Sequence, residues 1–193
     1  MARYVVGITG ASGSIYGIRT LEALRALGSV ETHLVMSRFA KRTMELEAGA
    51  DPEQVARLAD FAYDADDLAA PISSGSFATD GMLVIPCSIK SAAAIAYSLN
   101  DNLLVRAADV CLKERRRLVL VVRETPLHLG HLRTLTQLAE IGAMILPPIP
   151  GFYAKPASVD DIVNHTVGKA LDLLGIPNEL FRRWRGATSA DAP

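Results

Sequence analysis

Gly7-Ile8-Thr9-Gly10-Ala11-Ser12-Gly13 is the stretch that decides the fold of this 193-residue chain. It follows an apolar run, Tyr4 to Val6, that is typical of a β-strand, and it precedes a helical pattern that begins near Ser14. A glycine-rich turn from a strand into a helix gathers backbone N–H groups at one point, where phosphate binds well. The stretch therefore predicts an α/β fold with a nucleotide site at this turn.

The details of the turn favour a mononucleotide over a dinucleotide. The dinucleotide fingerprint needs G-x-G-x-x-G and an acidic residue about 20 residues further on. Here Tyr16 stands where the last glycine would fall, and the second strand ends in Ser37 rather than in a carboxylate. The chain also lacks the Gly-Lys-Ser/Thr of a P-loop. We expect FMN, and a purely structural turn without a ligand is the alternative.

The bulk composition excludes several classes of protein. Half of the residues are apolar, which predicts a globular chain with a substantial core. The formal net charge of −1 gives no electrostatic case for binding nucleic acid. Two cysteines, Cys87 and Cys111, make no disulfide framework, so we expect a cytoplasmic location. The start of the chain resembles a strand rather than a signal peptide, and no apolar run approaches the roughly 20 residues of a membrane span.

Short apolar runs alternate with helical patterns along the chain. The predicted strands are 3–9, 30–36, 81–86, 117–122 and 143–146, and the predicted helices are 14–27, 38–48, 90–98, 102–115, 128–141 and 159–174. Continuously apolar strands are typical of parallel sheets buried on both faces. We therefore predict a doubly wound, Rossmann-like (flavodoxin-like) parallel sheet flanked by helices. One flavin-binding domain is expected over 1–186, and the small polar tail 187–193 is expected to be disordered.

Ligands of such a sheet bind beyond the carboxyl ends of the strands, so the residues that follow each strand are candidates for function. Ser88 can cap the helix after the third main strand, next to Cys87, which we interpret as a small buried residue. Arg123-Glu124 directly follows a buried strand, an expected place for a general acid or base. Glu47 closes the second helix and can also face this cleft.

Further candidates lie on a helix and in two loops. Arg106 and Lys113 are seven residues apart on one predicted helix and share a face; together with Arg123 they could hold a doubly charged phosphate. The loop Ser73–Phe77 suits hydroxyl and backbone contacts with phosphate. The proline-rich loop 147–157 carries Phe152 and Tyr153. The alternatives are a solvated basic face, especially for Arg115–Arg117, an ordinary turn and a packed connector.

His128 and His131 are three residues apart on a helix, but no third ligand completes a set, so we expect capping or packing and no metal.

Together these motifs resemble the UbiX-type flavin prenyltransferases over about residues 3–185. The resemblance is carried, in order, by Gly7–Gly13, Ser74-Gly75-Ser76, Pro86-Cys87-Ser88, Arg106-Ala107-Ala108-Asp109, Leu112–Arg115, Arg123-Glu124 and Pro150–Tyr153. The segments Val30–Ser37 and Ile72–Phe77 are similar to one branch in particular, which serves as the B component of phenolic acid decarboxylase systems.

The resemblance implies a metal-independent reaction. Dimethylallyl phosphate alkylates reduced FMN at N5 and C6, and the product, prenylated FMN, passes to a UbiD-type decarboxylase. The resemblance also implies a homododecamer with sites between protomers.

Site residues follow from the same resemblance. The flavin-binding positions match Gly10, Ala11, Ser12, Ser37, Ser88, Ile89, Lys90, Ser91 and Arg123. The positions around the prenyl phosphate match Ser74, Arg106, Lys113, Arg123, Tyr153 and Lys169. The catalytic positions match Glu124 as acid and base, Ser12 beside the flavin N5, Glu47 nearby, and Trp184 facing the allyl group.

One departure stands out. Lys169 replaces an arginine that many members carry on the last helix, and lysine offers a point charge in place of a planar fork. Two alternatives stay open: an FMN-binding carrier or structural subunit of a decarboxylase complex, to which Lys169 lends support, and a flavin-dependent cysteine decarboxylase, against which Arg123-Glu124 argues.

Overall fold

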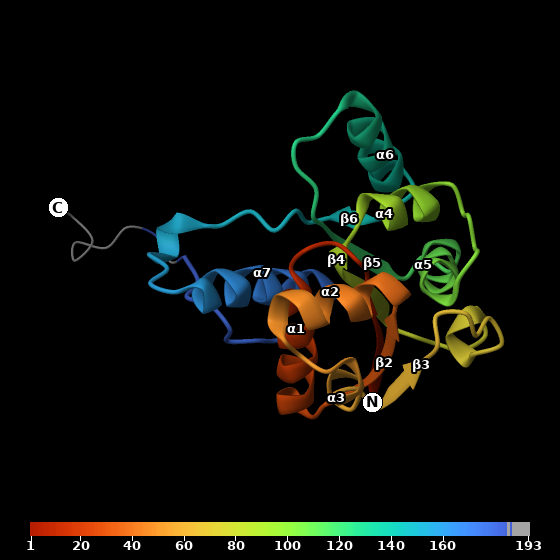
Figure 1. Cartoon of the computed structure of the whole chain (residues 1–193), viewed down its shortest axis with the longest axis horizontal. Coiled ribbons are helices and arrows are strands. Elements are labelled where there is room, and N and C mark those ends of the chain that lie inside the picture. The colour runs from red at the N-terminus through yellow and green to blue at the C-terminus, as the bar shows by residue number, and fades with distance from the viewer. Residues whose placement is uncertain (185, 187–193) are drawn as a thin grey trace.

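Six parallel strands form the central sheet of the computed structural model, which describes residues 1–184 and 186 (Figure 1). The strands are β1 (Ala2–Ile8), β2 (Val30–Met36), β3 (Phe61–Tyr63), β4 (Gly81–Cys87), β5 (Arg117–Val122) and β6 (Met144–Ile145). Their order is β3-β2-β1-β4-β5-β6. The chain therefore builds outward from β1 to β3 and then returns to β4 beside β1, which makes β1 and β4 the switch point of a doubly wound sheet. The predicted fold class is confirmed.

Helices cover both faces of the sheet. They are α1 (Ser14–Leu27), α2 (Arg38–Ala48), α3 (Pro52–Ala56), α4 (Ile89–Ala96), α5 (Leu103–Lys113), α6 (Leu129–Glu140) and α7 (Val159–Leu174), with short 3₁₀ turns at Pro71–Ser73 and Phe152–Ala154. One core joins α1, α2 and α7 to the sheet, and a second core joins α4, α5 and α6 to its other face. Strand residues alternate between the two, so that Val6 packs in the first core and Val5 in the second.

Two short elements between residues 49 and 80 escaped prediction. β3 has three residues and sits at the sheet edge, where Phe61 is 48% exposed, so it lacks the apolar run of a central strand. α3 has five residues and owes its start to Asp51, whose side chain accepts a hydrogen bond from Glu53 N, and to Pro52 in the first turn.

The segment after β6 leaves the sheet and carries the turn Phe152–Ala154 out to the start of α7 (Figure 1). After α7 the chain runs back along that helix. The tail 187–193, predicted to be disordered, lies outside the described residues. Within the described part of the chain, no helix is both long and apolar enough to span a bilayer.

Candidate functional site

Thr9 ties together the loops that follow β1 and β4. Its hydroxyl donates a hydrogen bond to Pro86 O at 2.8 Å and accepts one from Ser88 N at 2.7 Å, and its N–H also donates to Pro86 O. Ser37 N donates to Ile8 O at 3.0 Å, which fixes the end of β2 to the end of β1. These bonds bring the predicted flavin-binding residues of three loops to one edge of the sheet. Thr9 itself was not predicted, although a buried hydroxyl at the end of an apolar strand is a usable signal.

The start of α4 presents unpaired donors at this edge. Ser88 caps the helix as predicted, since its Oγ accepts from Ser91 N at 3.2 Å, and it also donates to Ser91 Oγ at 3.1 Å. Among the described residues, no protein group accepts a hydrogen bond from the N–H groups of Ile89 and Lys90. Ser37 and Ser88 line one hollow together with Lys90 and Ser91. Hydroxyls, free N–H groups and a lysine form a site for a phosphate group.

The start of α1 is different, because a carboxylate of the protein already occupies it. Glu47 Oε2 accepts hydrogen bonds from Gly13 N at 2.8 Å and from Ser14 N at 3.3 Å. Partial burial acts to raise the pKa of Glu47, but hydrogen bonds from the Ser12 side chain, Gly13 and Ser14 outweigh it and lower that pKa. In this structure the acceptor at the start of α1 is therefore Glu47, whereas the first N–H groups of α4 have no such partner among the described residues. The nucleotide site expected at the glycine turn stays a prediction.

Arg123 and Glu124 lie at the same edge of the sheet. Arg123 N donates to Cys87 O at 3.0 Å, which ties the end of β5 to the end of β4. Glu124 is half-buried, and its Oε1 accepts from Thr125 N at 3.1 Å. Burial raises the pKa of Cys87 to about 12, so this neighbouring thiol stays protonated at neutral pH, as expected of a buried structural residue.

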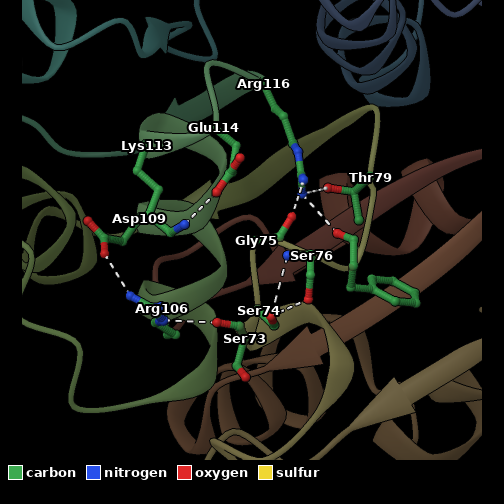
Figure 2. Close-up of polar contacts among 11 residues, drawn as sticks. Ser73, Ser74, Gly75, Ser76, Thr79, Arg106, Asp109, Lys113, Glu114 and Arg116 are labelled. Carbon is green, nitrogen blue, oxygen red and sulfur yellow. Dashed lines mark hydrogen bonds and ion pairs between the residues drawn. The ribbon is translucent and has the colours of Figure 1, made fainter.

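Three predicted phosphate ligands form a second group on α5 and its neighbouring loop (Figure 2). Arg106 donates to Ser73 O at 3.0 Å and to Asp109 Oδ2 at 3.1 Å, while Ser74 and Ser76 share a hydrogen bond of 2.8 Å between their hydroxyls. Gly75 packs so closely on the end of α5 that a Cβ there would lie 2.6 Å from Lys113 Nζ. Ser74, Arg106 and Lys113 thus form one cluster.

Arg116 holds this loop in place. Its guanidinium donates to Gly75 O at 2.6 Å, to Phe77 O at 2.9 Å and to Thr79 Oγ1 at 3.2 Å (Figure 2). The interpretation of Arg115–Arg117 as a solvated basic face is corrected for Arg116, which is half-buried. Its partners lie 37 to 41 residues away in sequence, so no local pattern marks it.

Lys113 and Arg123 lie at opposite ends of β5. Lys113 ends α5 just before β5 begins at Arg117, and Arg123 follows the last residue of that strand. Six strand residues at roughly 3.3 Å each separate the two ends by roughly 20 Å. The side chains of Lys113 and Arg123 start from opposite edges of the sheet, so the structure does not gather Arg106, Lys113 and Arg123 at one point within one chain.

A third group of predicted residues lies where α7 begins. The Tyr153 hydroxyl is 3.1 Å from His165 Nε2, and the rings of Tyr153 and Trp184 meet edge to face at 6.0 Å. Lys169 follows His165 by one helical turn on α7 and is exposed. Trp184 is 62% exposed, so its indole is open to a ligand or to another chain.

The segment that carries Trp184 is pinned to α7. Arg183 makes two hydrogen bonds of 2.8 Å to the Asp172 carboxylate, and these lower the pKa of Asp172. Asn178 donates to Gly168 O at 3.1 Å, and the Phe181 ring lies where a Cβ on Gly168 would stand, at 2.4 Å. Trp184 is therefore held beside Tyr153 by an ordered segment.

His128 caps α6, as predicted, by accepting from Gly130 N at 3.0 Å and His131 N at 3.3 Å. Within the described residues, no three His, Cys, Asp or Glu side chains gather in a way that could hold a metal ion.

Comparison with known proteins places the chain in a family. The family described as Flavoprotein matches residues 1–171. The flavin prenyltransferase UbiX of Escherichia coli (strain K12) is 58% identical over 189 residues, which are 97% of this chain and 100% of that protein. The chain belongs to the UbiX flavin prenyltransferase family.

Two solved structures share the fold of this flavin prenyltransferase. AnUbiX (PadA1), in complex with FMN and dimethylallyl pyrophosphate, has a TM-score of 0.95 and 50% identity over 97% of this chain and 99% of its own. A dodecameric FMN-dependent UbiX-like decarboxylase from Escherichia coli O157:H7 has a TM-score of 0.93 and 52% identity over 95% of this chain and 100% of its own.

The donors at the β1–β4 edge fit the FMN that this family uses. A flavin phosphate needs hydrogen-bond donors and positive charge, which Ser88, Ser91, Lys90 and the free N–H groups of α4 supply. The flavin prenyltransferase fold thus offers its anion site at α4, while Glu47 occupies the corresponding position at α1.

Proposed function

We propose that this flavin prenyltransferase joins the dimethylallyl group of dimethylallyl phosphate to N5 and C6 of reduced FMN. The product, prenylated FMN, then passes to a UbiD-type aromatic acid decarboxylase. The observation that carries the proposal is the bond from Arg123 N to Cys87 O, because it sets Arg123 and Glu124 at the same sheet edge as the α4 anion site. The Glu124 carboxyl, a candidate general acid and base, therefore lies at the sheet edge that is proposed to bind the flavin.

The residues of this edge hold and orient the flavin. Ser37, Ser88, Ser91 and Arg123 would donate to its phosphate and ribityl oxygens, and Gly10 and Ala11 would leave room for the ring system. Ser12 would lie beside N5, next to Glu47, whose pKa the Ser12 side chain helps to lower. When bound, reduced FMN supplies the two nucleophilic ring positions to which the prenyl group is joined.

The remaining residues act on the prenyl phosphate. Cationic side chains stabilise the departing phosphate, and the exposed Trp184 indole presents a π-face to positive charge on the allyl group. The Glu124 carboxyl would donate its proton to the departing phosphate oxygen, and the carboxylate would take up the proton that N5 loses on bonding to the allyl group. Glu124 would then donate that proton to the remaining double bond of the prenyl group and accept the proton that C6 loses when the second bond forms.

We place each phosphate site between two protomers. Ser74, Arg106 and Lys113 come from one copy, and Arg123, Tyr153 and Lys169 come from another. The separation of Lys113 from Arg123 by the length of β5 supports this division. A dodecameric neighbour in the family agrees with a homo-oligomer. We also propose a cytoplasmic location, in which the two free, buried cysteines stay reduced.

The test is an anaerobic incubation of the protein with reduced FMN and dimethylallyl phosphate, followed by mass spectrometry of the extracted flavin. We expect a mass gain of one prenyl unit that Glu124→Gln reduces by a factor of about 10² to 10⁴, the usual contribution of a general acid and base. Glu140→Gln, at the exposed end of α6, is the matched control and keeps the wild-type rate.

Unmodified FMN that stays tightly bound to the wild-type protein, with dimethylallyl phosphate and with the diphosphate, would overturn the proposal. That result would favour the carrier role, for which Lys169 in place of an arginine is the supporting observation.

A further inference from the structure

Two elements enclose the imidazole of His165. On one side, its ring meets the Tyr153 ring edge to face, with centroids 5.7 Å apart, and its Nε2 lies 3.1 Å from the Tyr153 hydroxyl. Gly151 makes this approach possible, because a Cβ there would stand 2.9 Å from His165 Cε1. On the other side, Phe181 of the pinned C-terminal segment packs edge-on at 4.9 Å. The orientation of His165 is therefore fixed from both sides.

The chemistry of a phosphate decides which of the two groups must donate. A phosphate dianion offers only acceptors, and the Tyr153 hydroxyl has one hydrogen. If Tyr153 gives that hydrogen to His165 Nε2, none is left for the phosphate. If His165 Nε2–H donates to the Tyr153 oxygen, the hydroxyl hydrogen points away from the imidazole and toward a ligand.

We propose that His165 is a positioning residue that donates from Nε2 to the Tyr153 oxygen and so directs the Tyr153 hydrogen at the prenyl phosphate. The proposal rests on the proposed function, in which Tyr153 binds that phosphate. It gives a physical role to His165, which lies neither at the sheet edge that is proposed to bind the flavin nor in the cationic cluster on α5.

The charges around His165 agree with a neutral imidazole. Burial, and then the charge of Lys169, lower the pKa of His165. Two cationic side chains, Lys155 and Arg182, and one carboxylate, Asp161, line the hollow beside it, so positive charge prevails there. A neutral imidazole has a single N–H, so the proposal fixes the tautomer with hydrogen on Nε2. A directed hydrogen on Tyr153 also matters more where Lys169 offers no planar fork to the phosphate.

The test compares His165→Leu with His165→Gln in anaerobic prenylation at varied dimethylallyl phosphate. Leucine cannot donate, so the Tyr153 hydroxyl loses its orientation. We expect KM for the prenyl phosphate to rise up to about tenfold, the upper end of the effect of losing one hydrogen bond between neutral groups, with kcat within about twofold. Glutamine donates from its amide and is expected to restore KM to within about threefold of wild type. Retention of FMN and the thermal unfolding midpoint are measured on each variant and should not change.

A double-mutant cycle with Tyr153→Phe makes the test specific. If His165 acts through the Tyr153 hydroxyl, His165→Leu adds nothing to KM in the Tyr153→Phe background. Equal increases in KM in both backgrounds, or no increase in the wild-type background, would overturn the inference while leaving prenylation itself intact. A wild-type protein that forms no prenylated flavin contradicts the proposed function instead, so the two failures can be told apart.

Discussion

At the scale of single residues, Glu47 of α2 caps the N-terminus of a different helix, α1. Its carboxylate supplies the charge and acceptor that the N-terminus of α1 needs, because Gly13 at the cap position has no side chain to do so. Glu47→Gln is therefore expected to lower stability by about 0.5–1 kcal/mol at pH 7, the range of a helix cap or dipole interaction. Glu45→Gln, which removes a surface ion pair on the same helix, is the control and is expected to cost less.

The pH dependence gives this prediction its sign. The folded pKa of Glu47 is lowered, so its stabilising effect is complete above the ordinary value of 4.5 and is lost as pH falls through the folded value. Thermal unfolding of the wild type and Glu47→Gln should differ at pH 7 and converge in acid below that value. A difference of the same size at both pH values would show that Glu47 acts through packing rather than through its charge.

Residue roles could be predicted where they depend on neighbours in sequence. Ser88 and His128 are caps whose partners lie within three residues, and a strand followed by Arg123-Glu124 marks a sheet edge. The roles of Thr9 and Arg116 could not be predicted in this way. Thr9 bonds to Pro86, 77 residues away, and this contact exists only because β1 and β4 are neighbours in the sheet. A long-range hydrogen bond has no periodicity or spacing in the sequence to reveal it.

At the scale of elements, the segment 175–184, which follows α7, holds Trp184 in place, and we call this segment the strap. The ion pair between Arg183 and Asp172 fixes the strap to α7. Trp184 is the only tryptophan in the chain, so its fluorescence reports the mobility of the strap directly. We expect Arg183→Gln to lower the steady-state anisotropy of Trp184 and to slow prenylation several-fold without loss of bound FMN. The pair is partly exposed and screened by solvent, so its contribution to overall stability should be small.

Arg182→Gln is the matched control for the strap, because Arg182 is an exposed neighbour of Arg183 on the same segment. It should leave the anisotropy unchanged, whereas Asp172→Asn should reproduce the effect of Arg183→Gln. If the anisotropy of Trp184 keeps its wild-type value in all three variants, the Arg183–Asp172 pair has no role in placing the indole. The strap is then held by Asn178 and Phe181 alone.

Elements with a clear apolar pattern could be predicted, and those without one could not. The central strands are buried on both faces and are flanked by helices with caps, so β1, β2, β4 and β5 follow from composition. The strap has no apolar periodicity in its sequence. It is held by three separate contacts with α7, made by Asn178, Phe181 and Arg183. Its order therefore comes from tertiary contacts that replace secondary structure.

At the scale of the whole molecule, the proposed phosphate site combines residues that lie far apart within one chain, so it would need a second copy of the chain. Lys113 and Glu124 lie near opposite ends of β5, so we expect each site to take Lys113 from one protomer and Glu124 from another. An oligomer made only of Lys113→Ala chains, or only of Glu124→Gln chains, should lose most of its prenylation activity. Mixed oligomers, formed by co-expression at equal amounts, contain some sites that receive both wild-type side chains.

Random mixing leaves roughly a quarter of the shared sites intact, so the mixed oligomer is expected to recover roughly a quarter of wild-type prenylation. A site built within one protomer would recover nothing, because every copy would carry one defect. The control mixes Arg106→Ala with Lys113→Ala: these residues belong to the same helix, every site then lacks one of them, and no activity should return. Recovery in the first mixture and not in the second would therefore assign Lys113 and Glu124 to different protomers of one site.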